Sequence, residues 1–67
     1  MLIEFSDVIG AFVKEQIEGI MVIDDQFGFS VRLLFKGGGC VDLYKNEPIE
    51  TAKLKYNKIV QEFKEGG

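Results

Sequence analysis

The segment Lys36-Gly37-Gly38-Gly39-Cys40 holds the residue types of this 67-residue chain that best suit ligand chemistry. Successive glycine N–H groups can form a concave nest for an anion, and Lys36 would add a positive charge beside that nest. The segment lacks the spacing of a P-loop and does not lead directly into a helix, whose N-terminus would strengthen anion binding. A plain hairpin loop is therefore the favoured interpretation, and Cys40 is expected to be a buried, unreactive thiol at the start of a strand.

Few other residues could carry catalysis or bind a metal ion. The chain has no histidine, the side chain that general acid–base catalysis uses most often, and its single cysteine cannot supply a zinc site. Asp24 and Asp25 could offer oxygen ligands to a divalent cation, but neighbouring residues on a strand point to opposite faces, so a solvated turn is expected. The sequence therefore predicts that this protein is not an enzyme and that it has no catalytic residue, no metal and no cofactor.

Length and composition predict a single domain that spans residues 1–67. With 46% hydrophobic and 28% charged residues, the composition is that of a folded globular protein. Domains of this size retain little stability unless a metal, a disulfide or another subunit adds to it. Because metals and disulfides are not expected here, a homodimer is the remaining common solution. The lone thiol also indicates a reducing compartment, the cytoplasm.

Charge is distributed unevenly along the chain. Residues 1–30 hold six acidic residues and one lysine, whereas residues 31–67 hold seven basic and five acidic residues. This asymmetry fits either attraction between the two halves of one monomer or a contact between subunits. The net charge of −3 disfavours binding to duplex nucleic acid. No segment approaches the roughly 20 apolar residues of a membrane span, so no membrane contact is expected.

The middle of the sequence predicts an antiparallel meander of three strands. Residues 20–25 are rich in β-branched side chains and end in a polar cluster, and residues 29–35 alternate between apolar and polar side chains. The glycines then lead into a third strand over residues 40–45. The strands are expected to be antiparallel, because each connection is too short for a parallel crossover. The face of the middle strand that is expected to be buried comprises Phe29, Val31, Leu33 and Phe35.

Residues 2–18 fit two structures. Their apolar residues recur at spacings of three and four, and Ser6 or Asp7 could cap an N-terminus, so a helix is expected. Gly10 weakens the interior of a helix, however, and Met1 to Phe5 would make a reasonable short strand. An extra hairpin is therefore the alternative, and with it the sheet would have four or five strands.

A second helix is predicted over residues 48–64. Asn46 is a good N-cap, and Pro48 suits a first helical turn because its missing N–H costs nothing there. The apolar residues of this segment fall within an arc of about 100°, which indicates a stripe that faces the sheet. The stripe comprises Ile49, Ala52, Tyr56, Ile59, Val60 and Phe63.

Two surfaces of the predicted fold are candidates for binding a partner. Leu54 lies on the lysine-rich side of the predicted C-terminal helix, away from its apolar stripe. Arg32 and Leu34 lie on the face of the middle strand opposite to the one expected to be buried. A single exposed leucine is normal, but it is also where a partner could anchor. Leu54, Leu34 and Arg32 are therefore the candidate partner-binding residues.

Three groups of residues follow one another along the chain: Phe35-Lys36-Gly37-Gly38, then Val41-Asp42-Leu43-Tyr44, and then Ala52, Tyr56 and Ile59. Their order resembles that of short proteins carried by phages and prophages of low-GC bacteria. The resemblance covers about residues 20–63 and implies a β-meander, a glycine turn and a C-terminal helix. It also implies an accessory protein that binds something of the host, including inhibitors of host defence systems. No functional residue is transferred, because the matching positions are all turn or core positions.

These features predict an α+β fold in which a small antiparallel meander packs against the C-terminal helix, with a further helix at the N-terminus. The expected function is that of a non-enzymatic module that acts through protein–protein association, as a homodimer or on a host protein. The alternative is a protein that sequesters a phosphorylated small molecule or nucleotide signal. Its binding residues would be Lys36, Gly37, Gly38 and Gly39.

Overall fold

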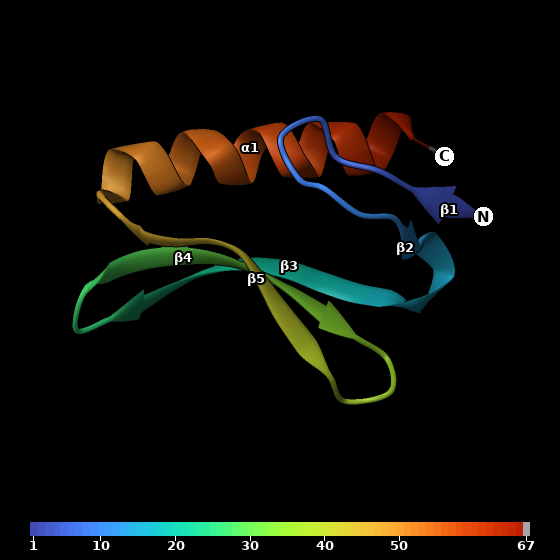
Figure 1. Ribbon diagram of the computed structural model, residues 1–67, viewed down its shortest axis with the longest axis horizontal. Coiled ribbons are helices and arrows are strands. Elements are labelled where there is room, and N and C mark those ends of the chain that lie inside the picture. Colours follow the sequence, from blue (N-terminus) through green and yellow to red (C-terminus); the bar gives the residue numbers. More distant parts are fainter. Residues whose placement is uncertain (67) are drawn as a thin grey trace.

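The chain folds into a three-stranded antiparallel sheet with one α-helix across a single face of it, in a computed structural model that describes residues 1–66 (Figure 1). The strands β3 (Ile17–Asp25), β4 (Gly28–Phe35) and β5 (Cys40–Glu47) are neighbours in chain order, and α1 (Ile49–Glu65) follows them. The predicted α+β class, the meander and the packed C-terminal helix are confirmed. No helix within residues 1–66 is long and apolar enough to cross a membrane.

Two tight hairpins connect the strands of the main sheet. In the first, between β3 and β4, the Asp25 carboxylate accepts the Phe27 N–H at 2.8 Å. Gly28 follows with a φ of +140°, a conformation that glycine adopts without steric cost. In the glycine loop between β4 and β5, the Phe35 N–H donates to the Gly39 carbonyl at 2.8 Å. Local turn chemistry therefore explains the meander.

Helix α1 begins slightly later than predicted. Pro48 is its N-cap, and the helix extends over Ile49–Glu65. Asn46, the predicted cap, instead belongs to β5 and has a φ of 58°, a left-handed conformation that asparagine adopts more readily than most residues. The apolar stripe packs on the sheet, and Ala52 and Ile59 within it are buried at 0% and 1% exposure.

The core lies between α1 and the middle of β4. Val31 and Leu33 are completely buried, as the alternation in the sequence predicts. Phe29 and Phe35 are only half-buried, because they lie close to the two ends of the same strand. The buried residues that contact one another in the core come from four elements and the N-terminal loop: Ile3, Phe5, Ile17, Leu33 and Ile59.

The N-terminal segment does not form the helix expected over residues 2–18. Instead, β1 (Leu2–Ile3) pairs antiparallel with β2 (Phe12–Val13), and a short 3-10 turn, η1 (Lys14–Gln16), leads into β3. The alternative of an extra hairpin is therefore closer to the structure. Because β1 and β2 form a two-stranded sheet of their own, the main sheet keeps three strands rather than four or five.

Burial explains why this segment is extended. Ile3 and Phe5 are two residues apart and only 3% and 2% exposed, so both side chains enter the core at the period of a strand. Phe5 also packs against Phe12, with the ring centroids 6.0 Å apart. Ile9, which would lie on the apolar side of the predicted helix, is fully exposed.

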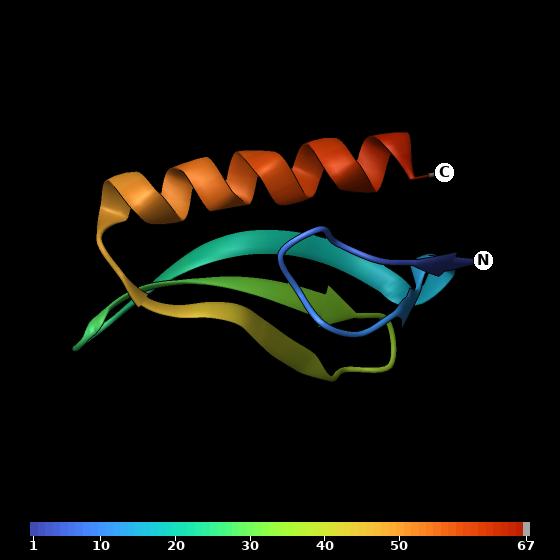
Figure 2. The same cartoon turned by 45° about the horizontal axis from the view of Figure 1, so that its top comes forward.

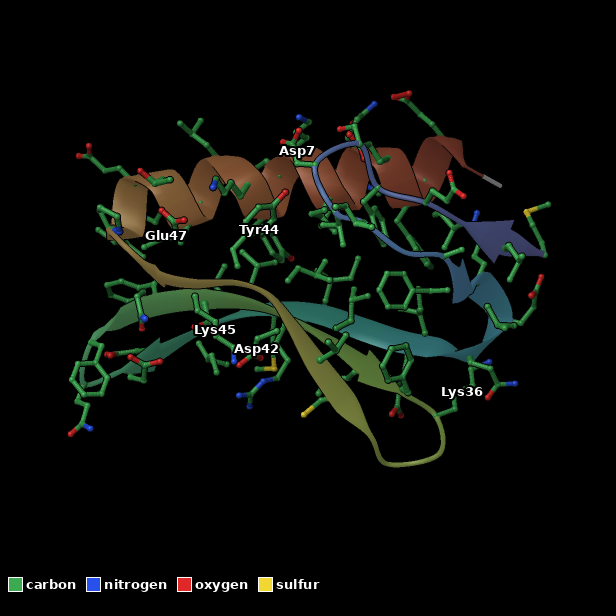
Figure 3. The ribbon with its side chains drawn as sticks, viewed as in Figure 1. Asp7, Lys36, Asp42, Tyr44, Lys45 and Glu47 are labelled. Atoms are coloured by element: carbon green, nitrogen blue, oxygen red, sulfur yellow. The ribbon has the colours of Figure 1, made fainter. Side chains whose placement is uncertain are left out.

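The N-terminal segment runs beside the C-terminal half of α1 (Figures 1 and 2). The backbone N–H and the hydroxyl of Ser6 donate to the Glu62 carboxylate at 2.8 and 2.7 Å, and the Lys58 ammonium donates to Asp7 at 2.6 Å. Asp7 lies on the side of the helix that faces Tyr44 of β5 (Figure 3). The segment therefore covers the core on the side of β5, and on the side of β3 it reaches the start of the strand, where Lys14 lies over the Phe63 ring.

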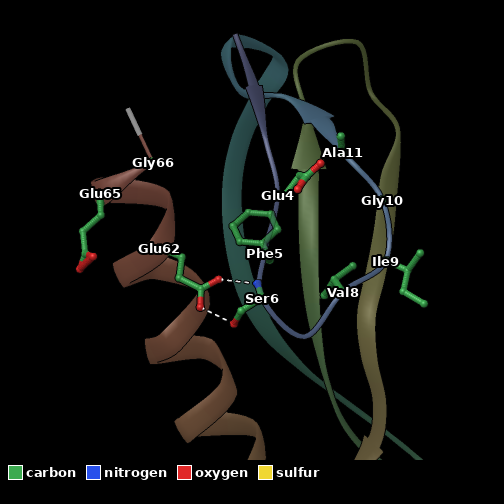
Figure 4. A pocket seen from close by; sticks show the side chains of 10 residues that line it. All are labelled: Glu4, Phe5, Ser6, Val8, Ile9, Gly10, Ala11, Glu62, Glu65 and Gly66. Carbon is green, nitrogen blue, oxygen red and sulfur yellow. Dashed lines mark hydrogen bonds between the residues drawn. The ribbon is translucent and has the colours of Figure 1, made fainter.

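The contact between Ser6 and Glu62 makes the stability of the fold sensitive to acid (Figure 4). Both hydrogen bonds from Ser6 favour the charged carboxylate and lower the pKa of Glu62 below its ordinary value of 4.5. The stabilising effect is therefore fully present above pH 4.5 and is lost as the pH falls through the lowered pKa. We expect Glu62→Gln to reduce this acid-dependent loss.

The measurement is urea unfolding of the parent and of Glu62→Gln at neutral pH and at several pH values below 4.5. Glu4→Gln is the matched control, because Glu4 lines the same hollow and is exposed. The difference in unfolding free energy between the parent and Glu62→Gln should shrink towards low pH, and that between the parent and Glu4→Gln should change less. A constant difference for Glu62→Gln would contradict this role of its carboxylate.

Candidate functional site

The face of the sheet that is turned away from α1 has no covering element within residues 1–66 (Figures 1 and 2). Arg32 and Leu34 lie on this face, because they alternate along β4 with the buried Val31 and Leu33. Two of the three predicted partner-binding residues are thus neighbours on one surface. We call this surface the open face, and its residues include Met21, Ile23, Ser30, Arg32, Leu34, Cys40 and Asp42.

An ion pair lies at the centre of the open face. The Arg32 guanidinium donates two hydrogen bonds to Asp42, with Nε–Oδ1 at 2.6 Å and the second contact at 3.3 Å. These bonds lower the pKa of Asp42 below its ordinary value. Because the two residues are opposite each other on neighbouring strands, their charges are neutralised within the sheet. Arg32 therefore adds a fixed, neutral polar group to the face rather than a free positive charge.

Apart from the buried Ser30, which pairs with Ile23, and Lys45, whose charge acts on Asp42, the rest of the open face is apolar. Met21 is 40% exposed and lies beside Arg32 on the neighbouring strand. Leu34 lies opposite Gly19, and a Cβ atom at Gly19 would come within 3.7 Å of Leu34. The missing side chain at Gly19 therefore leaves the flank of Leu34 uncovered. An apolar surface around a neutral ion pair is suited to packing against another protein surface.

The strand β3 forms one free edge of the sheet. It is nine residues long, and its central residues 19–23 carry no charge and no proline. An uncovered edge presents unpaired backbone N–H and C=O groups that pair readily with another strand. Proteins usually protect such edges with lysine, proline or bulges, and β3 has only one irregularity in register, between Ile17 and Gly19.

An apolar groove runs along this edge, between β3 and α1. It consists of two adjoining hollows, about 480 and 230 Å³ in volume, which share Ile20 and Tyr56. All of the residues that line them belong to these two elements, which agrees with the position of the N-terminal segment on the side of β5. The apolar residues that line the groove are Ile17, Ile20, Met21, Val22, Ile49, Tyr56, Val60 and Phe63.

The other edge of the sheet, β5, is less suited to pairing. Its register against β4 shifts twice, between Phe29 and Val31 and again between Val31 and Arg32. Asn46, near its end, has a positive φ, and Lys45 is exposed. Bulges of this kind bend an edge and interrupt its ladder of hydrogen-bonding groups. Of the two edges, β3 is therefore the better template for an added strand.

Leu54, the third predicted partner-binding residue, lies elsewhere. It is 71% exposed and is on the side of α1 that is turned away from the sheet. The open face is on the far side of the sheet, so Leu54 and Leu34 are separated by the core. The structure does not bring the three predicted residues together, and one flat contact could not use both leucines.

The glycine loop gives little support to an anion site. The Lys36 N–H donates to the Gln16 carbonyl at 2.8 Å and the Gly38 N–H donates to the Phe35 carbonyl at 3.0 Å, so both amides are already bonded. Gly38 has a φ of +98°, which fits its place in a tight turn. The loop lies at the end of the sheet, where Lys36 is exposed (Figure 3). Anion binding there stays a prediction.

The exposure of Cys40 differs from the prediction. It was predicted to be a buried thiol, but it is exposed on the open face, opposite Leu34. The reason is that β5 is an edge strand and Cys40 is its first residue, so no neighbouring strand or helix covers it. Within the described part of the chain, no three side chains of the types that hold metal ions lie together.

Another hollow, about 690 Å³ in volume, lies between the N-terminal loop and the end of α1 (Figure 4). Three carboxylates line it, those of Glu4, Glu62 and Glu65. The Glu62 carboxylate is already held by Ser6. No basic side chain lines this hollow within residues 1–66, so its carboxylates could pair with a cationic group but not with an anionic one.

A scan against protein-family models finds no match for this chain, and searches of curated proteins and of solved structures find no match either. The function of this protein is therefore inferred from the geometry of the open face, the β3 edge and the groove. Sequence alternation identified part of the open face. Residues of the β3 edge and of the groove were not identified as a site, because which edge of the meander stays uncovered depends on where α1 and the N-terminal segment pack.

Proposed function

We propose that this protein is a small non-enzymatic module that acts by binding other protein chains. The observation that carries the proposal is the β3 edge: an uncharged, regular stretch over residues 19–23, next to an apolar groove. Such an edge commonly serves β-strand addition, in which backbone hydrogen bonds supply affinity and side-chain pockets supply specificity. The single cysteine and the resemblance to phage accessory proteins favour the cytoplasm of a host cell, and a host protein as one partner.

We also propose a homodimer formed through the open face. Two copies packed with these faces together would bury Met21, Ile23 and Leu34, and would give an arrangement of helix, sheet, sheet and helix. A sheet with one apolar face left uncovered commonly buries it against a second layer. A contact between identical surfaces about a two-fold axis is the commonest form of oligomer. It would also add stability to a domain of only 67 residues.

A pair of leucine variants tests which surface makes the contact. Leu34→Glu should weaken self-association about a hundredfold, because a buried unpaired charge costs several kcal/mol. Leu54→Glu introduces the same charge on the outer side of α1 and should leave the association unchanged. Sedimentation velocity at micromolar concentrations measures both, and circular dichroism verifies that each variant is folded. Dissociation by Leu54→Glu alone would move the contact to the helix, and a strictly monomeric parent would refute the homodimer.

A further inference from the structure

We propose that the β3 edge and the groove beside it receive an extended segment of a partner protein as a fourth strand, and that this segment is apolar at alternate positions and basic at both ends. The inference rests on the proposed function and specifies the chemistry of its partner. It follows from the shape of the groove, from the positions of charge along β3 and from the poor fit of a second copy of this chain to the same edge.

The groove determines the apolar pattern of the segment. A strand added beside β3 would point alternate side chains towards α1, into the groove lined by Ile20, Tyr56 and Val60. Its other side chains would continue the open face next to Met21 and Ile23. From Glu18 to Asp24 the edge spans roughly 20 Å, at about 3.3 Å per residue. A segment of about seven residues with every second side chain apolar would therefore match it.

The charges determine what lies at the ends of the segment. Glu18, Asp24 and Asp25 are the charged residues of β3, and all three are exposed and acidic. They lie on either side of the uncharged stretch, so an added strand would meet a negative charge at each end. Lys53 lines the groove from α1 and carries the opposite charge, but it belongs to the helix and not to the paired edge. Opposite charges facing each other across strands stabilise the pairing, and like charges oppose it.

A second copy of this chain fits the edge poorly. If two β3 strands paired antiparallel about Met21, the centre of the uncharged stretch, Glu18 of one copy would lie opposite Asp24 of the other. The contact would repeat this repulsion on both sides of the two-fold axis. A basic segment from a different protein replaces both repulsions by attractions. The two surfaces therefore have different proposed partners. The β3 edge binds a basic segment of another protein, and the open face binds a second copy of this chain.

Two synthetic peptides with blocked termini test the proposal on the whole protein. One is Lys-Val-Thr-Val-Thr-Val-Lys, and the other has glutamate in place of both lysines. In 1H–15N NMR titrations the basic peptide should shift the amide resonances of β3 and of the groove residues. The acidic peptide should bind at least about tenfold more weakly, because two exposed attractions become repulsions. Added salt should reduce the difference.

A charge-exchange variant sharpens the test. Glu18→Lys combined with Asp24→Lys changes two exposed side chains and should reverse the order of the two peptides. Equal binding of both peptides to the parent, shifts confined to β5, or binding of neither would overturn the inference. Concentration-dependent shifts of β3 without peptide in Leu34→Glu, in which the open-face contact is broken, would do so as well, in favour of a second copy at the edge. If no peptide binds but Leu34→Glu still separates dimers, this inference fails and the proposed association through the open face stands.

Discussion

Replacing Phe5 by alanine should leave most of the protein unfolded. The Phe5 side chain is 2% exposed and belongs to the cluster of buried residues around Leu33 and Ile59. Removing a buried phenylalanine side chain typically costs about 3–5 kcal/mol, because the transfer free energy is lost and a cavity remains. A core of this size rarely supplies more than about 3–5 kcal/mol of net stability. The loss therefore approaches the whole free energy of unfolding.

Thermal and urea unfolding followed by circular dichroism measure this effect. Phe27→Ala is the matched control, because Phe27 is 71% exposed at the tip of the first hairpin and its removal should change stability little. Phe35→Ala should lie between the two, since Phe35 is half-buried and packs against Phe12 at 6.2 Å between ring centroids. Equal stability of Phe5→Ala and the parent would mean that the N-terminal segment does not complete the core.

A second large loss of stability is expected for Gly28→Val. Gly28 has a φ of +140°, which residues with a side chain rarely adopt, and a Cβ atom there would lie 3.0 Å from the Glu47 carbonyl oxygen. Two further backbone atoms, both of Asn46, lie within 3.2 Å of the same position. Backbone strain of this kind costs about 1–3 kcal/mol, and moving β5 aside adds to it. The variant should lose much of the stability of the sheet.

Gly37→Val provides the comparison within the same fold. A Cβ atom at Gly37 would meet no atom within 4 Å, and this glycine has no positive φ that requires it. Urea unfolding should therefore give a much smaller loss for Gly37→Val than for Gly28→Val. The opposite order would show that the glycine loop, rather than the close approach of Gly28 to β5, limits the stability of the meander.

Part of the candidate site follows from the sequence. Alternation along β4 predicts that Arg32 and Leu34 share the face opposite to Val31 and Leu33, because successive side chains on a strand point to opposite sides. The Arg32–Asp42 ion pair, the uncovered flank of Leu34 and the exposure of Cys40 depend on the register between strands. Register results from long-range pairing, so these features could not be read from one strand alone.

The local elements of this protein follow from its sequence alone: the meander from alternation and turn residues, and α1 from its apolar stripe. The conformation of residues 2–18 depends on long-range packing, because their apolar spacing favours a helix but also fits a strand. The extended form is the one that buries Ile3 and Phe5 beneath α1. By covering the β5 side of the core, this segment also determined that the β3 edge and its groove remain open to a partner.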